Sequence, residues 1–453
     1  MNNSICWPII RTASFEDTHI NIQRQMNETQ WMSPDNLRYL QMLQLRLIVE
    51  HAIKNLPFYT KRFESIGVKT AKDLDEESWD RLPVLTRKEI QENVINTESI
   101  PPSHGRIASI ASSGSTSTPI RITKTDLSNL IWTASSLRNE VWNRLNPEEM
   151  MVFIRHGIDG GTPEQLATLR STGLYQNNYG PPNSIFLKTG GVWIIDTRCP
   201  VSYHADLISR THPECITAMP SNLSLLLKYY EENNNAPNWI KSVWTVSEAL
   251  GDLRERCWKV LNCKIIDSYS CAETGYIALQ CPEHEHYHIQ SETIRLEVLH
   301  PDNTHCKPGE VGRVVITPLH NFASPLFRYE IGDEAEVGDP CPCGRGLPVL
   351  KRIIGRTYDY LTMPDGRKQR VDTGYYPICE IPAVRELQII QRSKELIEIL
   401  LVLSKSLCTD EIKNITELCT ERFGDVFEYK ITEVDSINQT TSGKRRIFIS
   451  EVD

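Results

Sequence analysis

The chain has 453 residues, which is enough for a large domain and at least one smaller one. Its composition, 40% hydrophobic and 24% charged, is typical of an ordinary globular protein. The net charge of -9 argues against nucleic acid or an anionic membrane as the main partner, but it does not exclude a nucleotide, because backbone amides and metal ions can neutralise phosphate locally.

The first 21 residues lack the basic and then apolar order of a secretion signal. The apolar run at 399–403 is far shorter than a membrane-spanning segment. We therefore expect a cytoplasmic protein, and we expect its 13 cysteines to be thiols or metal ligands.

The first strong element is a helix that begins with the hydroxyl of Ser33 and with Pro34. It should end near Asn55, because Pro57 disfavours helical geometry at Leu56. Leucines predicted to share one face of this helix are Leu37, Leu40, Leu43 and Leu47.

From residue 106 to about 319, short β-rich runs alternate with helical stretches, which predicts α/β layers. The expected strands are 107–110, 120–123, 151–154, 192–195, 243–246 and 264–266, and the expected helices are 127–144, 163–174, 221–232 and 250–261. Strands separated by polar turns follow at 294–299, 312–316 and 347–354, and they predict an antiparallel, barrel-like end to the large domain.

A new unit is expected after residue 356, with strands at 387–391 and 396–403, a helix at 409–423 and a strand near 427–434. The predicted domains are therefore 1–356 and a small α+β domain at 357–453.

Residues 112–119 form a hydroxyl-rich loop, Ser-Ser-Gly-Ser-Thr-Ser-Thr-Pro, between two β-rich runs. Small side chains and Gly114 allow backbone amides and hydroxyls to face phosphate oxygens. The loop is not a Walker A motif, and taken alone it would more simply be an exposed turn.

Four further motifs carry isolated charges. Glu273 lies in a turn of small residues, 267–275, and offers the hard oxygens that Mg²⁺ prefers. Asp333 ends the segment Arg-Tyr-Glu-Ile-Gly-Asp at 328–333, and one carboxylate can accept hydrogen bonds from both hydroxyls of a ribose. Gly355 and Arg356 form a pair, and Lys444 lies in a Ser-Gly-Lys loop near the end of the chain.

In this order, the motifs resemble those of the adenylate-forming (acyl-CoA synthetase-like) ligases, in the branch of phenylacetate–CoA ligase-like, CapK-like and coenzyme F390 synthetase-like proteins. The resemblance extends from about Leu37 to the end of the chain. It implies an α/β fold, in which a large multi-layer N-terminal domain with a barrel-like β subdomain precedes a small, mobile α+β lid. It also implies ATP and Mg²⁺ as cofactors.

The resemblance assigns roles to individual residues. Residues implied to hold the β- and γ-phosphates are Ser113, Gly114, Ser115, Thr116, Ser117 and Thr118. Residues implied to form the adenine slot are Ser247, Glu248, Ala249, Ser268, Tyr269 and Ser270. Asp333 would bind the ribose, Arg356 the ribose or a phosphate, Glu273 the Mg²⁺, and Lys444 would be the adenylation lysine.

The chain departs from the family pattern at three positions. Ser117 stands where glycine is usual, and Thr118 stands where many members carry lysine. Tyr358 stands at the hinge, where Asp or Lys is usual, which weakens the expectation of a full lid rotation.

Two short segments, 281–288 and 341–343, gather cysteines and histidines. One Cys and one His from the first segment, with both Cys of the second, would make a structural Cys₃His zinc site. The expected ligands are Cys281, His288, Cys341 and Cys343, with His284 and His286 as alternatives to His288. The competing interpretation is buried thiols beside a solvated, histidine-rich turn.

The favoured function is an ATP-dependent carboxylic acid ligase that forms an acyl-adenylate and passes the acyl group to an acceptor. Coenzyme A is the expected acceptor and an aryl or arylacetic acid the expected substrate; an amine or a carrier-protein thiol are alternative acceptors. Segments 151–161, with His156, and 175–182 are candidate walls of the acid pocket.

A non-catalytic nucleotide-binding scaffold is the competing hypothesis, and the departures at Ser117, Thr118 and Tyr358 favour it. The sequence leaves the acid, the acceptor, the pathway and the oligomeric state open, with a homodimer as one option.

Overall fold

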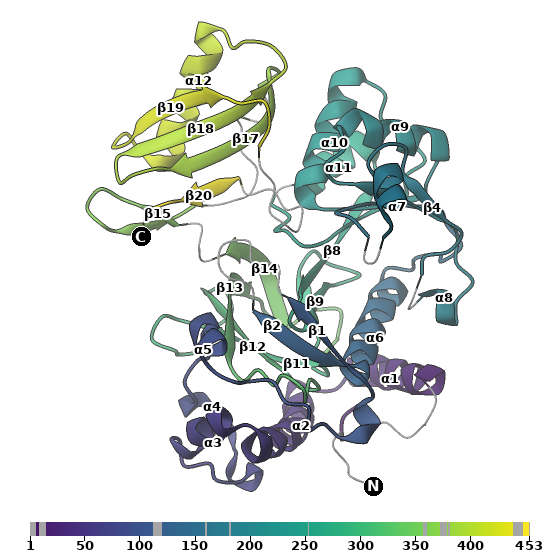
Figure 1. Cartoon of the computed structure of the whole chain (residues 1–453), viewed down its shortest axis with the longest axis vertical. Coiled ribbons are helices and arrows are strands. Elements are labelled where there is room, and N and C mark those ends of the chain that lie inside the picture. The colour runs from purple at the N-terminus through teal and green to yellow at the C-terminus, as the bar shows by residue number, and fades with distance from the viewer. Residues whose placement is uncertain are drawn as a thin grey trace. The chain divides into compact units, whose positions relative to one another are not determined.

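The computed structural model describes residues 6–8, 15–111, 120–158, 161–180, 183–251, 253–356, 360–371, 378, 381–437 and 447–452. The chain forms two compact units (Figure 1). Unit 1 comprises Met1–Pro147, Gly180–Lys188 and Ser268–Ile354, and unit 2 comprises Glu148–Tyr179, Thr189–Asp267 and Gly355–Asp453. The predicted domain boundary after residue 356 stays a prediction.

The helices of unit 1 lie mostly in its N-terminal part. They are α1 (Phe15–Thr29), α2 (Pro34–Asn55), α3 (Pro57–Glu64), α4 (Glu76–Arg81), α5 (Arg87–Glu92), α6 (Asp126–Trp142) and α8 (Asn183–Phe186), with 3₁₀ turns at Ala71–Asp73 and Pro102–His104. The predicted bounds of α2 are confirmed: the Ser33 hydroxyl accepts a hydrogen bond from the amide of Asn36 at 3.3 Å, and the helix ends at Asn55.

Of the four leucines predicted to share one face of α2, only Leu37 is fully buried. Glutamines take part of that face instead. Gln41 donates to the carbonyl of Ser291 at 2.8 Å, and Gln44 donates to that of Leu319 at 3.1 Å. These hydrogen bonds offset the cost of burying two amides, so the buried face turns away from the leucine stripe.

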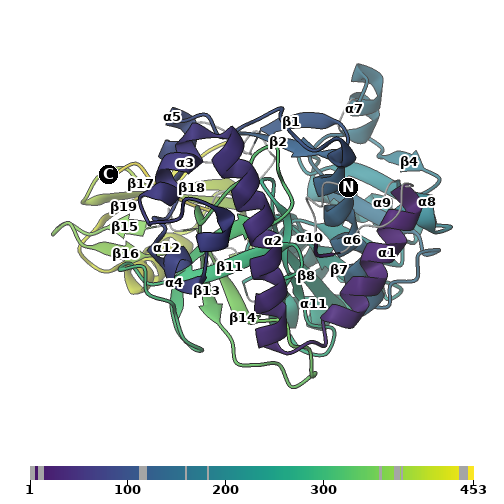
Figure 2. The ribbon, with the colours of Figure 1, turned by 90° about the horizontal axis from the view of Figure 1, so that it is seen from below.

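An antiparallel sheet forms the centre of unit 1. Its strands are β11 (Ile294–Leu299), β12 (Val311–Pro318), β13 (Tyr329–Val337), β14 (Val349–Arg356), β10 (Tyr287–Ile289), β9 (Gly275–Gln280) and the second half of β8 (Lys264–Cys271), in that order. Helix α2 runs across this sheet (Figure 2), and its Leu45 and Ile48 belong to the same buried cluster as Val314 and Ile316 of β12. The predicted change to antiparallel strands is confirmed.

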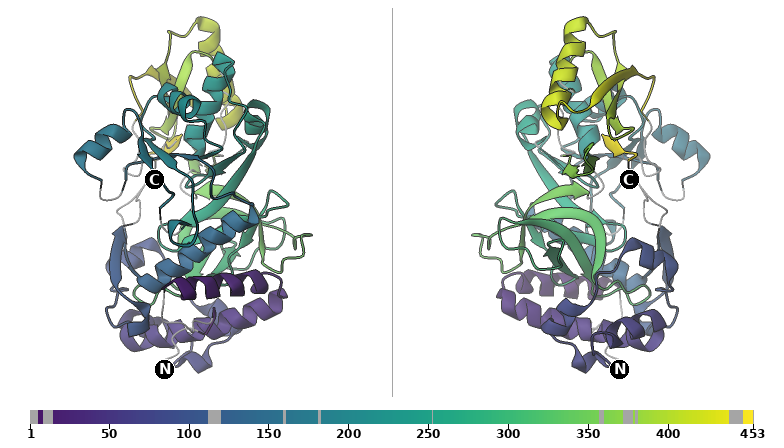
Figure 3. Two further views of the ribbon diagram at one scale, coloured as in Figure 1. Left: turned by 90° about the vertical axis from the view of Figure 1, so that its right-hand side faces the viewer. Right: turned by 90° about the vertical axis from the view of Figure 1, so that its left-hand side faces the viewer.

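Helix α6 packs beside α1 (Figure 3), where Ile22 and Met26 meet Leu130 and Ala134. α6 follows a separate hairpin of β1 (Ile107–Ala111) and β2 (Arg121–Thr125), which pair in antiparallel register. The hairpin therefore holds the start of α6 beside β2.

Unit 2 contains a mostly parallel sheet, as the alternating pattern predicted. Its strands are the first half of β8, β7 (Ser242–Thr245), β6 (Cys215–Ala218), β3 (Met151–Arg155), β5 (Val192–Asp196) and the antiparallel β4 (Leu174–Gln176). Its helices are α7 (Pro163–Leu169), α9 (Val201–Thr211), α10 (Pro220–Asn233) and α11 (Leu253–Leu261). The sequence analysis did not predict β6 or α9, and its predicted helix at 163–174 is five residues longer than α7.

The last part of unit 2 is α+β. A four-stranded sheet has the order β19 (Glu428–Glu433), β18 (Leu396–Leu403), β17 (Val384–Gln391), β20 (Phe448–Ser450), and β15 (Tyr360–Thr362) pairs with β16 (Lys368–Arg370). Helix α12 (Thr409–Phe423) lies on one face of the four-stranded sheet (Figure 3), where Ile415 and Phe423 join Ile389 and Ile399 in one core. The predicted bounds of β18 and α12 are confirmed. No helix among the described residues is long and apolar enough to span a membrane.

Candidate nucleotide and acid site

The Glu273 turn joins two antiparallel strands of unit 1. Cys271, the last residue of β8, pairs with Gly275, the first residue of β9, so Glu273 lies at the tip of the hairpin, where it is 8% exposed. Gly275 has φ +91°, and a Cβ there would lie 2.3 Å from the Trp132 ring of α6. Two features therefore require glycine at position 275: the positive φ angle and the close approach of the Trp132 indole. The packing of Trp132 against Gly275 holds the turn against α6.

Tyr269 and Asp333 meet in unit 1, although 64 residues separate them in the chain. Tyr269 lies on β8 and Asp333 on β13, and the phenolic hydroxyl donates to Oδ2 of Asp333 at 2.8 Å. Tyr269 is largely buried. The residue that the resemblance assigned to adenine, Tyr269, is therefore hydrogen-bonded to the residue that it assigned to ribose, Asp333. Tyr269 lies on β8, the strand that leads to Glu273.

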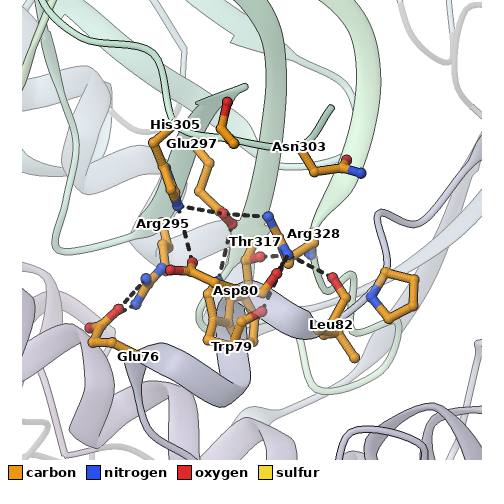
Figure 4. Close-up of polar contacts among 12 residues, drawn as sticks. Glu76, Trp79, Asp80, Leu82, Arg295, Glu297, Asn303, His305, Thr317 and Arg328 are labelled. Carbon is orange, nitrogen blue, oxygen red and sulfur yellow. Dashed lines mark hydrogen bonds and ion pairs between the residues drawn. The ribbon is translucent and has the colours of Figure 1, made fainter. Parts of the chain in front are cut away.

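Arg328, just before β13, anchors this strand to the N-terminal helices (Figure 4). Its Nη1 donates to the carbonyls of Asp80 and Leu82, both at 2.6 Å, and its Nη2 lies 3.0 Å from Oε1 of Glu297. Trp79 donates to the other oxygen of Glu297 at 3.1 Å.

Arg328 and Glu297 are both buried, and Arg328 has φ +51°. Breaking such a pair leaves a buried charge uncompensated, so the pair holds the start of β13 in one position. Asp333 consequently projects from a rigid base.

A small cavity of about 30 Å³ lies beside the Glu273 turn, within unit 1. Its walls include Glu273, Trp132, Tyr276, Lys124 of β2, and Asn321. Lys124 is 9% exposed, and its ammonium lies 5.7 Å from the centre of the Trp132 ring. Burial lowers the pKa of Lys124 from its ordinary value, against the opposing effect of the nearby Cys271 and Glu273.

The sequence analysis did not predict Lys124 or Asn321 as site residues. For Lys124 the strand periodicity could have indicated burial, because Lys124 continues the alternation of Ile120, just before β2, and Ile122, and all three are buried. The position of Asn321 follows only from the long-range packing of its loop, which no local pattern encodes.

The predicted segment Ser247, Glu248 and Ala249 lies in unit 2, after β7. Ser247 has φ +76°, and the Glu248 carboxylate accepts hydrogen bonds from the amide and the hydroxyl of Ser221 at 2.9 and 3.1 Å. Glu248 therefore caps the first turn of α10. Its backbone contribution to an adenine slot stays a prediction, as does that of Ala249.

Ser268 and Ser270 lie on β8 on either side of Tyr269; Ser268 is buried and pairs with Leu279. His156 follows β3 in unit 2, and the cavity described above does not include it.

Several predicted residues lie outside the described part of the chain. They are Ser113, Gly114, Ser115, Thr116, Ser117, Thr118, Tyr358 and Lys444. Arg356 ends β14, and its side chain also lies outside the description. Their roles stay predictions.

The cysteine and histidine segments come together in unit 1. Donor atoms of Cys281, His286, His288 and Cys341 all lie within 4.8 Å of one another, which fits the donor set and spacing of a tetrahedral zinc site. His288 Nδ1 faces the carbonyl of Leu347 at 3.4 Å, which leaves Nε2 for a ligand. Cys343 Sγ lies 3.5 Å from that Nε2. Three of the four predicted ligands thus gather, and His286 competes with Cys343 for the fourth place.

Residues 372–451 match the CapK C-terminal domain. The chain is 23% identical over 262 residues to protein CapK of Staphylococcus aureus, a match that covers 56% of each chain. It is 25% identical over 355 residues to the phenylacetate–coenzyme A ligase of Thermus thermophilus, covering 74% of this chain and 73% of the ligase.

Among solved structures, 2-hydroxyisobutyryl-CoA ligase in the postadenylation state superposes with a TM-score of 0.68 at 18% identity, over 94% of this chain and 92% of that one. An anthranilate CoA ligase in complex with anthranoyl-AMP gives a TM-score of 0.52 at 17% identity, over 76% of this chain and 65% of that one. These likenesses confirm the expected fold.

Proposed function

We propose that this chain, a relative of CapK and of the phenylacetate–coenzyme A ligases, is an ATP-dependent ligase that converts a carboxylic acid into an acyl-adenylate. The observation that carries the proposal is the hydrogen bond from Tyr269 to Asp333. Tyr269 lies on β8, the strand that leads to the buried Glu273. Three residues expected to serve one nucleotide are thereby gathered from two distant segments.

Asp333 would accept hydrogen bonds from the ribose hydroxyls through the carboxylate oxygens that Tyr269 orients. The Tyr269 ring would stack against the adenine, and Ser247, Glu248 and Ala249 would complete the adenine slot. The hydroxyls and amides at 113–118 would hold the β- and γ-phosphates, and Arg356 would reach the ribose or a phosphate.

Glu273 would hold Mg²⁺ through its carboxylate, and the ion would offset the charge of the departing pyrophosphate. The acid's carboxylate attacks the α-phosphate, the bond to the bridging oxygen breaks, and pyrophosphate leaves. Lys444 would reduce the repulsion between the two anions as they approach. We assign it to a small C-terminal lid, residues 357–453.

Coenzyme A is the proposed acceptor, because the phenylacetate–coenzyme A ligase of Thermus thermophilus and the 2-hydroxyisobutyryl-CoA ligase, to which the chain is similar, are both CoA ligases. The acid is proposed to be aryl or arylacetic, after the phenylacetate–coenzyme A ligases. An amine or a carrier-protein thiol remains the alternative acceptor.

The test is exchange of labelled pyrophosphate into ATP over a panel of carboxylic acids. Exchange that requires an acid and is lost in Lys444→Ala supports the ligase. Tight ATP binding without exchange for any acid contradicts it and favours the nucleotide-binding scaffold. AMP release with and without coenzyme A then identifies the acceptor.

We also propose a structural zinc ion held by Cys281, His288 and Cys341, with His286 or Cys343 as the fourth ligand. The spacing of the described donors supports this. Such an ion would pin the segment after β9 to the turn before β14. Metal content of His286→Gln and of Cys343→Ser would identify the fourth ligand.

A further inference from the structure

The cavity beside Glu273 contains polar atoms that no described residue satisfies. Asn321 is 4% exposed, and neither its Oδ1 nor its Nδ2 has a hydrogen-bond partner among the described residues. A buried amide left without partners costs free energy, so native proteins rarely retain one without a role.

Lys124 faces the same cavity from β2. Lys124 is 9% exposed, and its ammonium lies 5.7 Å from the centre of the Trp132 ring. A cation held this deep needs an anion to offset its desolvation. In the proposed function Glu273 serves Mg²⁺, and a ligand would then have to supply the anion.

We propose that Lys124 and Asn321 form an oxyanion-binding site in the cavity beside Glu273, which takes a phosphate or carboxylate group of an enzyme ligand as its magnesium salt. This inference rests on the proposed function, because it assigns Mg²⁺ to Glu273. Without a metal ion, Lys124 and Glu273 have no net charge together, and the carboxylate would repel a second anion.

The chemistry of the walls defines the ligand group. The ammonium and Nδ2 of Asn321 donate to oxygens, and Oδ1 of Asn321 accepts from a protonated oxygen or a metal-bound water. The cavity of about 30 Å³ has room for one such group. Two sources fit: the pyrophosphate released from ATP, or a second polar group on the acid.

The test is calorimetric titration of the full chain with pyrophosphate, succinate and phenylacetate, each with and without Mg²⁺. Lys124→Met keeps the length of the side chain and removes the charge, and Asn321→Leu replaces the amide with an apolar side chain of similar size. We expect each to weaken oxyanion binding about tenfold or more, since each removes a hydrogen bond to a charged group. Lys88→Met, at an exposed lysine of α5, is the control and should bind as the wild type does.

If Lys124→Met and Asn321→Leu bind pyrophosphate more weakly than the wild type does, the group bound in the cavity comes from ATP. If they bind succinate more weakly, the group belongs to the acid substrate. Unchanged binding of both, or no binding to the wild type, overturns the proposal. Asn321→Leu should also raise the melting temperature of the ligand-free protein or leave it unchanged; a fall of several degrees would mean that the amide has a structural role, and overturns the proposal too. If Lys124→Met does not fold, Lys124→Gln takes its place.

The readout is binding, so it is independent of catalysis. A wild-type protein that exchanges pyrophosphate into ATP but binds neither pyrophosphate nor succinate through Lys124 and Asn321 contradicts the inference alone. Oxyanion binding that depends on Lys124 in a protein without exchange contradicts the proposed function alone.

Discussion

The hydroxyl of Tyr269 donates a hydrogen bond to Oδ2 of Asp333 at 2.8 Å, and so joins the end of β8 to the middle of β13. One side-chain contact thereby orients the carboxylate expected to bind ribose and the ring expected to face adenine. A substitution of Tyr269 or of Asp333 should therefore affect both the ribose contact and the adenine contact.

We predict that Tyr269→Phe raises the KM for ATP roughly tenfold to 100-fold, because a hydrogen bond to a carboxylate contributes about 1.5–3 kcal/mol and the ring itself is retained. Asp333→Asn should raise it further, since the acceptor for the ribose hydroxyls is weakened. Pyrophosphate exchange at varied ATP concentration measures both.

The double variant should be less impaired than the sum of the two single variants, because they disrupt one contact. Strict additivity would contradict a shared role. An unchanged KM in Asp333→Asn would remove Asp333 from the nucleotide site.

For the hairpin tip we predict that Glu273→Gln lowers the rate of exchange about 100-fold or more while the protein stays folded. The amide keeps the size of the side chain but loses the charge that would hold Mg²⁺. Excess Mg²⁺ should restore part of the rate. Glu64→Gln, at an exposed position at the end of α3, is the control. Equal rates in the two variants would contradict the magnesium role.

How far the sequence predicts this fold depends on how local the determinants are. Ser33 and Pro34 fixed the start of α2, and Pro57 its end, because capping and proline geometry act within one turn. The buried face of α2 could not be predicted. It includes Gln41 and Gln44, whose side chains donate hydrogen bonds to backbone carbonyls about 250 residues or more away in the chain.

The same reasoning applies to the candidate site. The motifs around Glu273 and Asp333 were recognisable one by one, and the structure adds the contact through Tyr269. Lys124 and Asn321 belong to no motif. They share a cavity only because the β1–β2 hairpin and the loop after β12 meet beside the Glu273 turn.

Arg328 and Glu297 give a prediction about stability. Arg328→Met should lower the free energy of unfolding by about 3–5 kcal/mol, because it leaves the buried Glu297 carboxylate uncompensated. Replacing Glu297 with Leu in the same protein should recover part of that loss. Urea unfolding followed by tryptophan fluorescence measures both changes. A loss below about 1 kcal/mol in the single variant would contradict the anchoring role.

Glu140 on α6 gives a prediction about pH. Burial raises the pKa of its carboxyl from 4.5 to about 7, although Asn183 donates a hydrogen bond to it at 2.7 Å. The folded state thus holds a proton that the unfolded state has released between these pH values, so stability falls as pH rises from about 4.5 to 7.

Glu140→Gln should abolish that fall. The interval between the two pKa values corresponds to about 3 kcal/mol, so the variant should be more stable than the wild type by up to that amount at pH 8 and similar to it at pH 4.5. Urea unfolding across this pH range measures the difference. A variant less stable at pH 8 would mean that the ionised carboxylate is stabilised in the fold.

The cluster of Cys281, His288 and Cys341 gives the last prediction. Purified protein should contain about one zinc per chain, and Cys341→Ser should lose most of it, because a serine hydroxyl is a far weaker ligand than a thiolate. The melting temperature should fall with the metal, since an ion bound only by the folded state adds its binding free energy to stability. Chelation of the wild type should lower the melting temperature to the same value. Cys408→Ser, at an exposed cysteine, is the control. If the wild type holds no zinc after growth with zinc, or if Cys341→Ser retains it, the segments around β10 are held together by thiol and imidazole packing alone.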